Sequence, residues 1–147
     1  MSIFDSFSIN ASGLTAERYR MDVISENIAN IDTTRTEDGT PYRRKLVTFE
    51  EKGKNGTFAS ALAKAKGDYI GGGVRVGKTY EDTETEMKMV YDPSHPDADE
   101  NGYVTYPNVN VITEMTALID ASRSYEANAT AFSASKSMAV KGLEMAQ

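Results

Sequence analysis

Residues 109–146 read VNVITEMTALIDASRSYEANATAFSASKSMAVKGLEMA and contain no proline. Apolar residues recur there at alternating spacings of four and three, the repeat of a helix that buries one face. Ser122 and Lys136 interrupt this stripe, and small residues beside it would let another backbone approach closely. Pro107 marks the start of the segment. We therefore predict a helix over 109–147 with these apolar positions: Val111, Met115, Leu118, Tyr125, Ala129, Phe132, Ala139 and Leu143.

A second stripe with the same spacing lies at the other end of the chain, over residues 1–31. Asn10 and Glu17 interrupt it, and Gly13 inside it costs about 1 kcal/mol relative to alanine. Such a stripe also fits the buried face of an ordinary globular helix, and both interpretations stay open. Its apolar positions are Ile3, Phe7, Leu14, Met21, Ile24, Ile28 and Ile31.

The middle of the chain, residues 32–108, differs in composition because it holds all four prolines and most of the glycines. Asp-Gly and Asn-Gly pairs mark turns between short runs typical of strands. The runs are 42–49, 73–80 and 83–91, and 57–66 predicts a short helix. The predicted fold class is α+β. Long helices over 1–31 and 109–147 form a coiled-coil-like pair, and a small β-rich region over 32–108 lies between them in the sequence.

The composition limits what this chain can be. It has 147 residues, 39% of them hydrophobic, and no tryptophan, which is lean for a compact core. We therefore expect other subunits to complete its apolar faces. A net charge of -6 argues against nucleic-acid binding, and the absence of cysteine excludes thiolate chemistry. We find no membrane-spanning run and expect no cleaved signal peptide.

Residues 72–79, GGVRVGKT, match the phosphate-binding pattern G-x-x-x-x-G-K-[ST]. A phosphate-binding loop needs a buried strand before it and a helix opening at the lysine. Here an Ala-Lys-rich stretch precedes the match, and a strand-like alternation follows Thr79. We predict that these glycines form a turn or bulge that leads into a strand.

Other chemical motifs are weak. Residues 97–102 open like a calcium-binding loop, but Asn108 stands where the bidentate glutamate belongs, so a loop held by Asx-turn hydrogen bonds is the better interpretation. His95 is the only histidine and cannot build a zinc site with cysteines. We therefore predict no enzyme activity, no metal and no cofactor.

Four stretches of the sequence resemble bacterial flagellar rod and hook proteins. They are SGLTAER at 12–18, NIAN at 27–30, TTRTEDGTPYRRK at 33–45 and the run from Tyr91 to Phe132 that begins YDPSHPDADENGYV. The last is the most specific and is similar to the proximal-rod branch of the family. Residues 50–72 match nothing in the family pattern and are interpreted as a local insertion.

This resemblance implies a structural subunit of the basal-body rod, which transmits torque from motor to hook. Members self-associate with other rod proteins in a helical array and contact the basal-body base and the flagellar export apparatus. They lie in the periplasmic part of the flagellum, are not membrane-embedded, and bind neither nucleic acid nor a small-molecule substrate. The predicted assembly residues are the apolar positions given above, except Ile31 and Ala139, together with Asn27, Asn30 and Asn128 from the shared motifs.

Two other functions stay open at this point. A coiled-coil adaptor or export-associated binding module would have helices that are ordered before any polymer exists. A nucleotide-binding enzyme would bind ATP and lose that binding when Lys78 is replaced.

Overall fold

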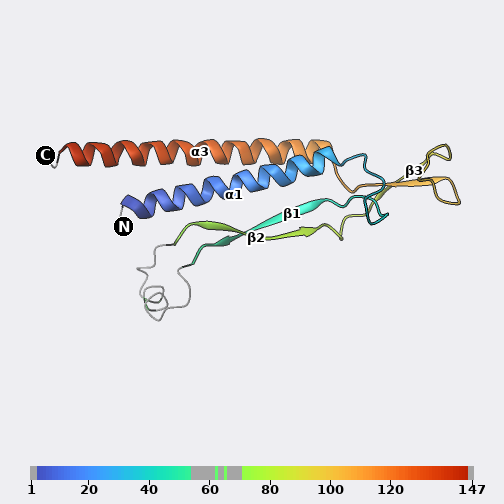
Figure 1. The fold of residues 1–147 in the computed structure, drawn as a ribbon, viewed down its shortest axis with the longest axis horizontal. Coiled ribbons are helices and arrows are strands. Elements are labelled where there is room, and N and C mark those ends of the chain that lie inside the picture. The colour runs from blue at the N-terminus through green and yellow to red at the C-terminus, as the bar shows by residue number, and fades with distance from the viewer. Residues whose placement is uncertain (1–2, 54–61, 63–64, 66–70, 146–147) are drawn as a thin grey trace. The chain divides into compact units, whose positions relative to one another are not determined.

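The computed structural model describes residues 3–53, 62, 65 and 71–145 (Figure 1). Contacts divide the chain into two compact units. The first unit comprises Met1–Tyr19, Thr48–Gly77 and Ala121–Gln147, and the second comprises Arg20–Val47 and Lys78–Asp120. The element order is α1, β1, β2, β3, β4, α3. Two long helices with two small two-stranded sheets between them in sequence confirm the predicted α+β class.

The two helices, α1 (Ile3–Ala29) and α3 (Val111–Glu144), confirm the two predicted helical stretches. Asn110 caps α3, since its Oδ1 accepts hydrogen bonds from the backbone N–H groups of Ile112 and Thr113 at 3.0 and 3.3 Å. The helix therefore begins two residues later than the sequence predicts. Helix α1 ends before residue 31 because the chain turns at 30–32, where the Asn30 side chain bonds to the Glu26 carbonyl at 2.9 Å.

In the first unit, α1 and α3 pack in opposite directions. The rings of Phe7 and Phe132 meet edge to face, with centroids 5.2 Å apart. Further along α1, Gly13 faces Asn128, and a Cβ atom at Gly13 would lie 3.0 Å from the Asn128 Oδ1 atom. Gly13 lowers the helix propensity of α1, but the absence of a side chain there allows the two helices to approach closely.

Strands β1 (Lys45–Glu51) and β2 (Val74–Glu81) form one two-stranded sheet. In the first unit, the start of β2 docks on α1. Gly73 has a φ of 100°, and the backbone N–H of Val74 donates to Ser12 Oγ at 3.0 Å. A Cβ atom at Gly73 would lie only 2.2 Å from Ser12 Oγ, so this contact requires glycine.

The second unit contains an antiparallel hairpin of β3 (Lys88–Tyr91) and β4 (Tyr103–Tyr106), with Lys88 opposite Tyr106 and Tyr91 opposite Tyr103. Val104 of β4, opposite Val90 of β3, is fully buried. Strand β4 was not predicted from the sequence.

The predicted strand over 83–91 is wrong for its first five residues. Asp82 Oδ1 accepts hydrogen bonds from the backbone N–H groups of Glu84 and Thr85 at 3.1 and 3.0 Å, which bends the chain before β3. The short helix predicted at 57–66 falls mostly outside the described residues. Among the residues that the structure describes, no helix combines the length and apolar character needed to cross a bilayer.

Candidate functional site

The side chain of Asn27, near the end of α1, is 1% exposed and uses its full hydrogen-bonding capacity. Its amide nitrogen donates to the Lys45 carbonyl at 2.9 Å and to Glu114 Oε2 at 3.0 Å. Its Oδ1 accepts from the Lys45 N–H at 2.8 Å and from the Tyr42 hydroxyl at 2.9 Å. One amide thus connects α1, α3 and the first residue of β1.

Glu114, also 1% exposed, lies in the first turn of α3 and carries a charge that Arg44 offsets. The Arg44 Nε donates to Glu114 Oε1 at 2.7 Å, and a terminal guanidinium nitrogen lies 2.7 Å from the same oxygen. A second terminal nitrogen lies 3.9 Å from Asp82 Oδ2. A buried carboxylate with a guanidinium and an amide donor is adequately compensated, whereas one without partners would be costly.

Asn108, which precedes α3, holds the other side of the same backbone. Its Oδ1 accepts from the Arg44 N–H at 2.9 Å, and its amide nitrogen donates to the carbonyls of Asp82 and Thr85 at 2.9 and 3.1 Å. The Arg44 carbonyl accepts from the Asp82 N–H at 2.8 Å. Two buried asparagines therefore satisfy the backbone of residues 44 and 45 from opposite sides.

Two groups of this network have displaced pKa values. Hydrogen bonds from the Thr85 backbone N–H and hydroxyl lower the pKa of Asp82. Burial, with a smaller effect of the Glu26 carboxylate, raises the pKa of Tyr42 to about 12. At neutral pH Asp82 is therefore an acceptor only, and Tyr42 is the neutral phenol that donates to Asn27.

We call Asn27, Tyr42, Arg44, Asp82, Asn108 and Glu114 the buried polar network. Each of these side chains is bonded to backbone or to another member, so the chemistry of the network is positional: it sets where β1 and the two helices meet within the second unit. Across the residues described here, no three His, Cys, Asp or Glu side chains are grouped as a metal site would require.

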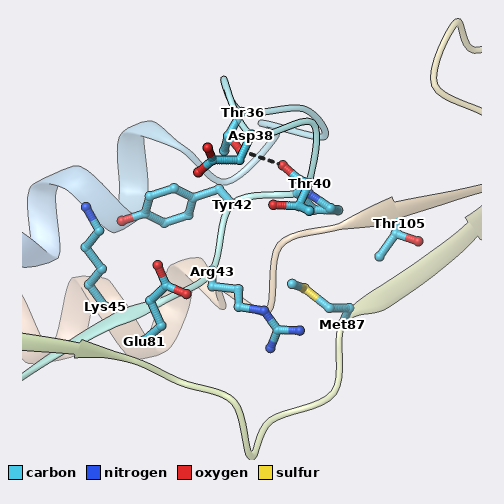
Figure 2. A pocket seen from close by; sticks show the side chains of 10 residues that line it. Thr36, Asp38, Thr40, Tyr42, Arg43, Lys45, Glu81, Met87 and Thr105 are labelled. Carbon is cyan, nitrogen blue, oxygen red and sulfur yellow. Dashed lines mark hydrogen bonds between the residues drawn. The ribbon is translucent and has the colours of Figure 1, made fainter.

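Beside this network lies a hollow of about 500 Å³ (Figure 2). Tyr42, Lys45 and Glu81 line one part of it, and Met87 and Thr105 line another. Figure 2 shows the Arg43 side chain extending between these two groups. Charges of both signs surround the hollow without converging on one point, so it selects no particular ligand chemistry.

The match to a phosphate-binding loop has the wrong local structure. Strand β2 continues through Gly77, Lys78 and Thr79, so no helix opens at the lysine. The backbone N–H groups of a strand cannot converge on a phosphate as those of a helix N-terminus do. The prediction that the glycines lead into a strand is confirmed, because residues 71–73 directly precede β2.

The loop that opens like a calcium site joins β3 to β4. Asp99 Oδ1 accepts from the backbone N–H groups of Asn101 and Tyr103 at 2.9 and 2.8 Å, and Gly102 has a φ of 78°. Asp97 bonds to the Thr34 hydroxyl at 2.9 Å. The predicted Asx-turn hydrogen bonds are confirmed.

The predicted assembly residues differ in burial within the folded chain. Ile24 and Asn27 are buried, whereas Met115 and Leu143 are exposed. The side chain of Ile3 falls outside the described part. The remaining ones are half-buried: Phe7, Leu14, Met21, Ile28, Asn30, Val111, Leu118, Tyr125, Asn128, Ala129 and Phe132.

The face of α3 directed at α1 carries polar and small residues, which a search for large apolar residues does not select. Glu114, Ala121, Asn128 and Ser135 recur every seven residues, and none of them belongs to the predicted stripe. Ala121 is fully buried, and Ser135 Oγ accepts from the Asn10 amide at 3.4 Å. Five residues of the network were not predicted from the sequence as site residues: Tyr42, Arg44, Asp82, Asn108 and Glu114. All but Asp82 lie in the stretches 33–45 and 91–132 that resemble rod and hook proteins, which was the available signal.

Comparison with known proteins gives two family models. One, described as flagella basal body rod protein, matches residues 7–35, and another, described as flagellar basal body rod FlgEFG protein C-terminal, matches residues 100–145. FlgC, the flagellar basal-body rod protein of Bacillus subtilis, is 46% identical over 151 residues, covering 99% of both chains. The chain belongs to the FlgC family of flagellar basal-body rod proteins.

Other FlgC proteins are similar over the same extent. The protein of Borreliella burgdorferi is 45% identical over 155 residues, covering 100% of this chain and 99% of its own. That of Escherichia coli O6:H1 is 38% identical over 147 residues, covering all of both chains. The resemblance read from the sequence motifs is thus confirmed, and the FlgC relationship extends through the β-rich middle as well as the helices.

Proposed function

We propose that this chain is a structural subunit of the bacterial flagellar basal-body rod. The observation that carries the proposal is identity of 38–46% across the full chain to relatives named as flagellar basal-body rod proteins. In this role it associates with copies of itself and with other rod proteins in a helical array that transmits torque from motor to hook. The role is positional and non-catalytic, and it uses no cofactor, nucleic acid or small-molecule substrate.

The outer side of α3 supports association through helices. Ile112, Met115 and Ile119 are all exposed and follow one another at spacings of three and four. An exposed stripe with this spacing suits a second helix laid along it. We assign the stripe to a helix of a neighbouring rod subunit, and Met115 belongs to it. Nearer the end of α3, in the first unit, Met138, Val140 and Leu143 are also exposed.

The buried residues of the predicted interface contribute differently. Asn27 acts by holding α1 to α3 through Glu114, so that the outer stripe is presented in a fixed geometry, and Ile24 is part of the core of α1. An open helical array needs two different, complementary patches on each copy, which a fixed geometry favours.

The location follows from this role. We infer that the chain resides in the periplasmic part of the basal body and reaches it through the flagellar export apparatus without a cleaved signal. The sequence-level division into assembly helices at 1–31 and 109–147 and a central region at 32–108 is our proposal for how these tasks are distributed.

The experiment is complementation of a strain that lacks this chain. Ile119→Asp places a charge in the outer stripe, and Thr113→Asp places one on another exposed side of the same helix. We expect cells with Ile119→Asp to be non-motile and to lack rods in purified basal bodies, and cells with Thr113→Asp to swim. Normal rods in the strain without the chain, or with Ile119→Asp, would contradict the proposal.

A further inference from the structure

One face of the β3–β4 hairpin exposes large side chains. The register places Met89, Tyr91, Tyr103 and Thr105 on the same face, since Met89 lies opposite Thr105 and Tyr91 opposite Tyr103. Met89 is 61% exposed, Tyr91 63% and Tyr103 42%. We call these four residues the hairpin face. Exposed tyrosine and methionine gathered at one place are typical of protein-binding surfaces.

The aromatic rings of the hairpin face are held in place. The centroids of Tyr91 and Tyr103 lie 5.3 Å apart with an interplanar angle of 66°. A Cβ atom at Gly102 would lie 2.9 Å from the Tyr91 ring and 3.2 Å from Pro93, so this glycine leaves room for the ring against the loop. Rings fixed before binding lose little conformational entropy when a partner arrives.

A hollow of about 290 Å³ adjoins this face and is lined in part by Tyr103, Thr105, Asp97 and Asp99. Asp97 is engaged with Thr34 and with Arg35, whose guanidinium lies 3.3 Å from the Asp97 carboxylate. Asp99 Oδ1 accepts hydrogen bonds from the loop backbone, while its Oδ2 has no hydrogen bond among the described residues. The hollow therefore offers one uncommitted carboxylate oxygen beside an aromatic ring.

The loop beside the hairpin face is negatively charged. The loop from Asp92 to Gly102 contains four acidic residues and neither lysine nor arginine. Arg35, the basic residue at the hollow, is already paired with Asp97. Carboxylates and tyrosine faces both attract a cation, the second through the ring quadrupole.

We propose that the hairpin face docks a basic segment of a neighbouring protein, and that a lysine or arginine side chain of that segment enters the hollow between Asp99 and Tyr103. This surface is separate from the outer stripe of α3, and its register, exposure and charge do not depend on the rod assignment. The two family models match residues 7–35 and 100–145, so β3 and most of the hairpin loop lie outside both matched ranges. A surface outside these ranges suits recognition of one particular neighbour.

The test is a titration of the full-length, isotope-labelled chain followed by NMR. One probe is a soluble 12-residue peptide of lysine, leucine and glycine, and the other carries glutamate in place of every lysine. We expect the basic peptide to shift the signals of Tyr91, Asp99 and Tyr103, and its binding to weaken with added salt. The acidic peptide should shift none of them.

Three variants separate binding from folding. Asp99→Asn keeps the Oδ1 acceptor for the loop and removes the charge, whereas Tyr91→Ser removes the ring. Each change should lower the affinity for the basic peptide by about fivefold. Tyr91→Phe keeps the ring and should bind as the unaltered chain does. Unchanged amide signals of Val90 and Val104 verify that the hairpin is intact. Should Tyr91→Ser disturb the hairpin, Asp99→Asn decides the question.

Several results would overturn the proposal. They are the absence of shifts at millimolar basic peptide, equal binding of both peptides, or shifts confined to other elements. Peptide-independent dimerisation that Tyr91→Ser abolishes would assign the hairpin face to a second copy of this chain instead.

Discussion

Asn27 and Glu114 are joined by a buried hydrogen bond of 3.0 Å although 87 residues separate them in the sequence. The bond links the end of α1 to the first turn of α3, and the same two side chains hold Lys45 and Arg44 at the start of β1. These polar contacts therefore help to determine where the helices meet in the second unit. Such contacts favour one helix register over its neighbours, because a shifted register would leave buried groups unpaired.

Replacing Asn27 by alanine should reduce the free energy of unfolding by about 3 kcal/mol or more, since it leaves several buried groups without partners. Asn10→Ala is a matched control, because Asn10 makes one part-buried bond of 3.4 Å to Ser135. The control should cost no more than about 1 kcal/mol. Urea unfolding of the purified subunit measures both. Equal losses would mean that the Asn27 bonds have no special weight.

Glu114 and Arg44 should be energetically coupled. In a double-mutant cycle with Glu114→Gln and Arg44→Met, we expect a coupling energy of about 1–3 kcal/mol, because each single change leaves the other partner buried or unneutralised. The same cycle with Arg75→Met and Glu50→Gln is the control, since that pair lies on the surface. There we expect about 0.5 kcal/mol or less. Additive effects at Glu114 and Arg44 would contradict the ion pair.

Tyr42 should make stability depend on pH in the alkaline range. Its pKa of about 12 in the folded chain exceeds the ordinary value of 10.0, so its contribution is fully present below pH 10 and is lost as the pH rises through 12. Tyr42→Phe should lack this dependence. The phenol can be followed by carbon NMR of labelled tyrosine. A Tyr42 phenol that ionises together with exposed tyrosines would disprove its burial.

Two glycines should respond oppositely to alanine. Gly73→Ala should destabilise the chain by about 1–3 kcal/mol, because φ is positive there and the new Cβ would collide with Ser12. Gly142→Ala in α3 meets nothing within 4 Å and should stabilise it by about 0.5–1 kcal/mol. Thermal unfolding of both variants measures the difference. The same sign for both would refute this account of the contact between α1 and β2.

The sequence predicted the elements with long regular patterns. The spacing of apolar residues over 109–147 was enough to place α3, and the alternation at 73–80 was enough to place β2 within a residue at each end. Both patterns report on local structure, so a single stretch of chain contains all the information that they need.

The contacts between elements were not predictable in this way. An apolar count favours Met115 over Glu114, yet Glu114 is buried and Met115 is exposed. Burial of Glu114 depends on Asn27 and Arg44, which are distant in sequence, so no local pattern predicts these partners. Likewise β4 is only four residues long and exists because β3 pairs with it.

The most direct test of the rod assignment uses the absence of cysteine from this chain. Ile119→Cys introduces a single thiol in the outer stripe, whose reaction with a maleimide is measured in the isolated subunit and in purified basal bodies. We predict rapid labelling of the subunit, strong protection in the basal bodies, and full labelling again after their dissociation in urea. Equal labelling in both states, or basal bodies that do not contain the chain, would contradict a rod subunit that assembles through this face of α3.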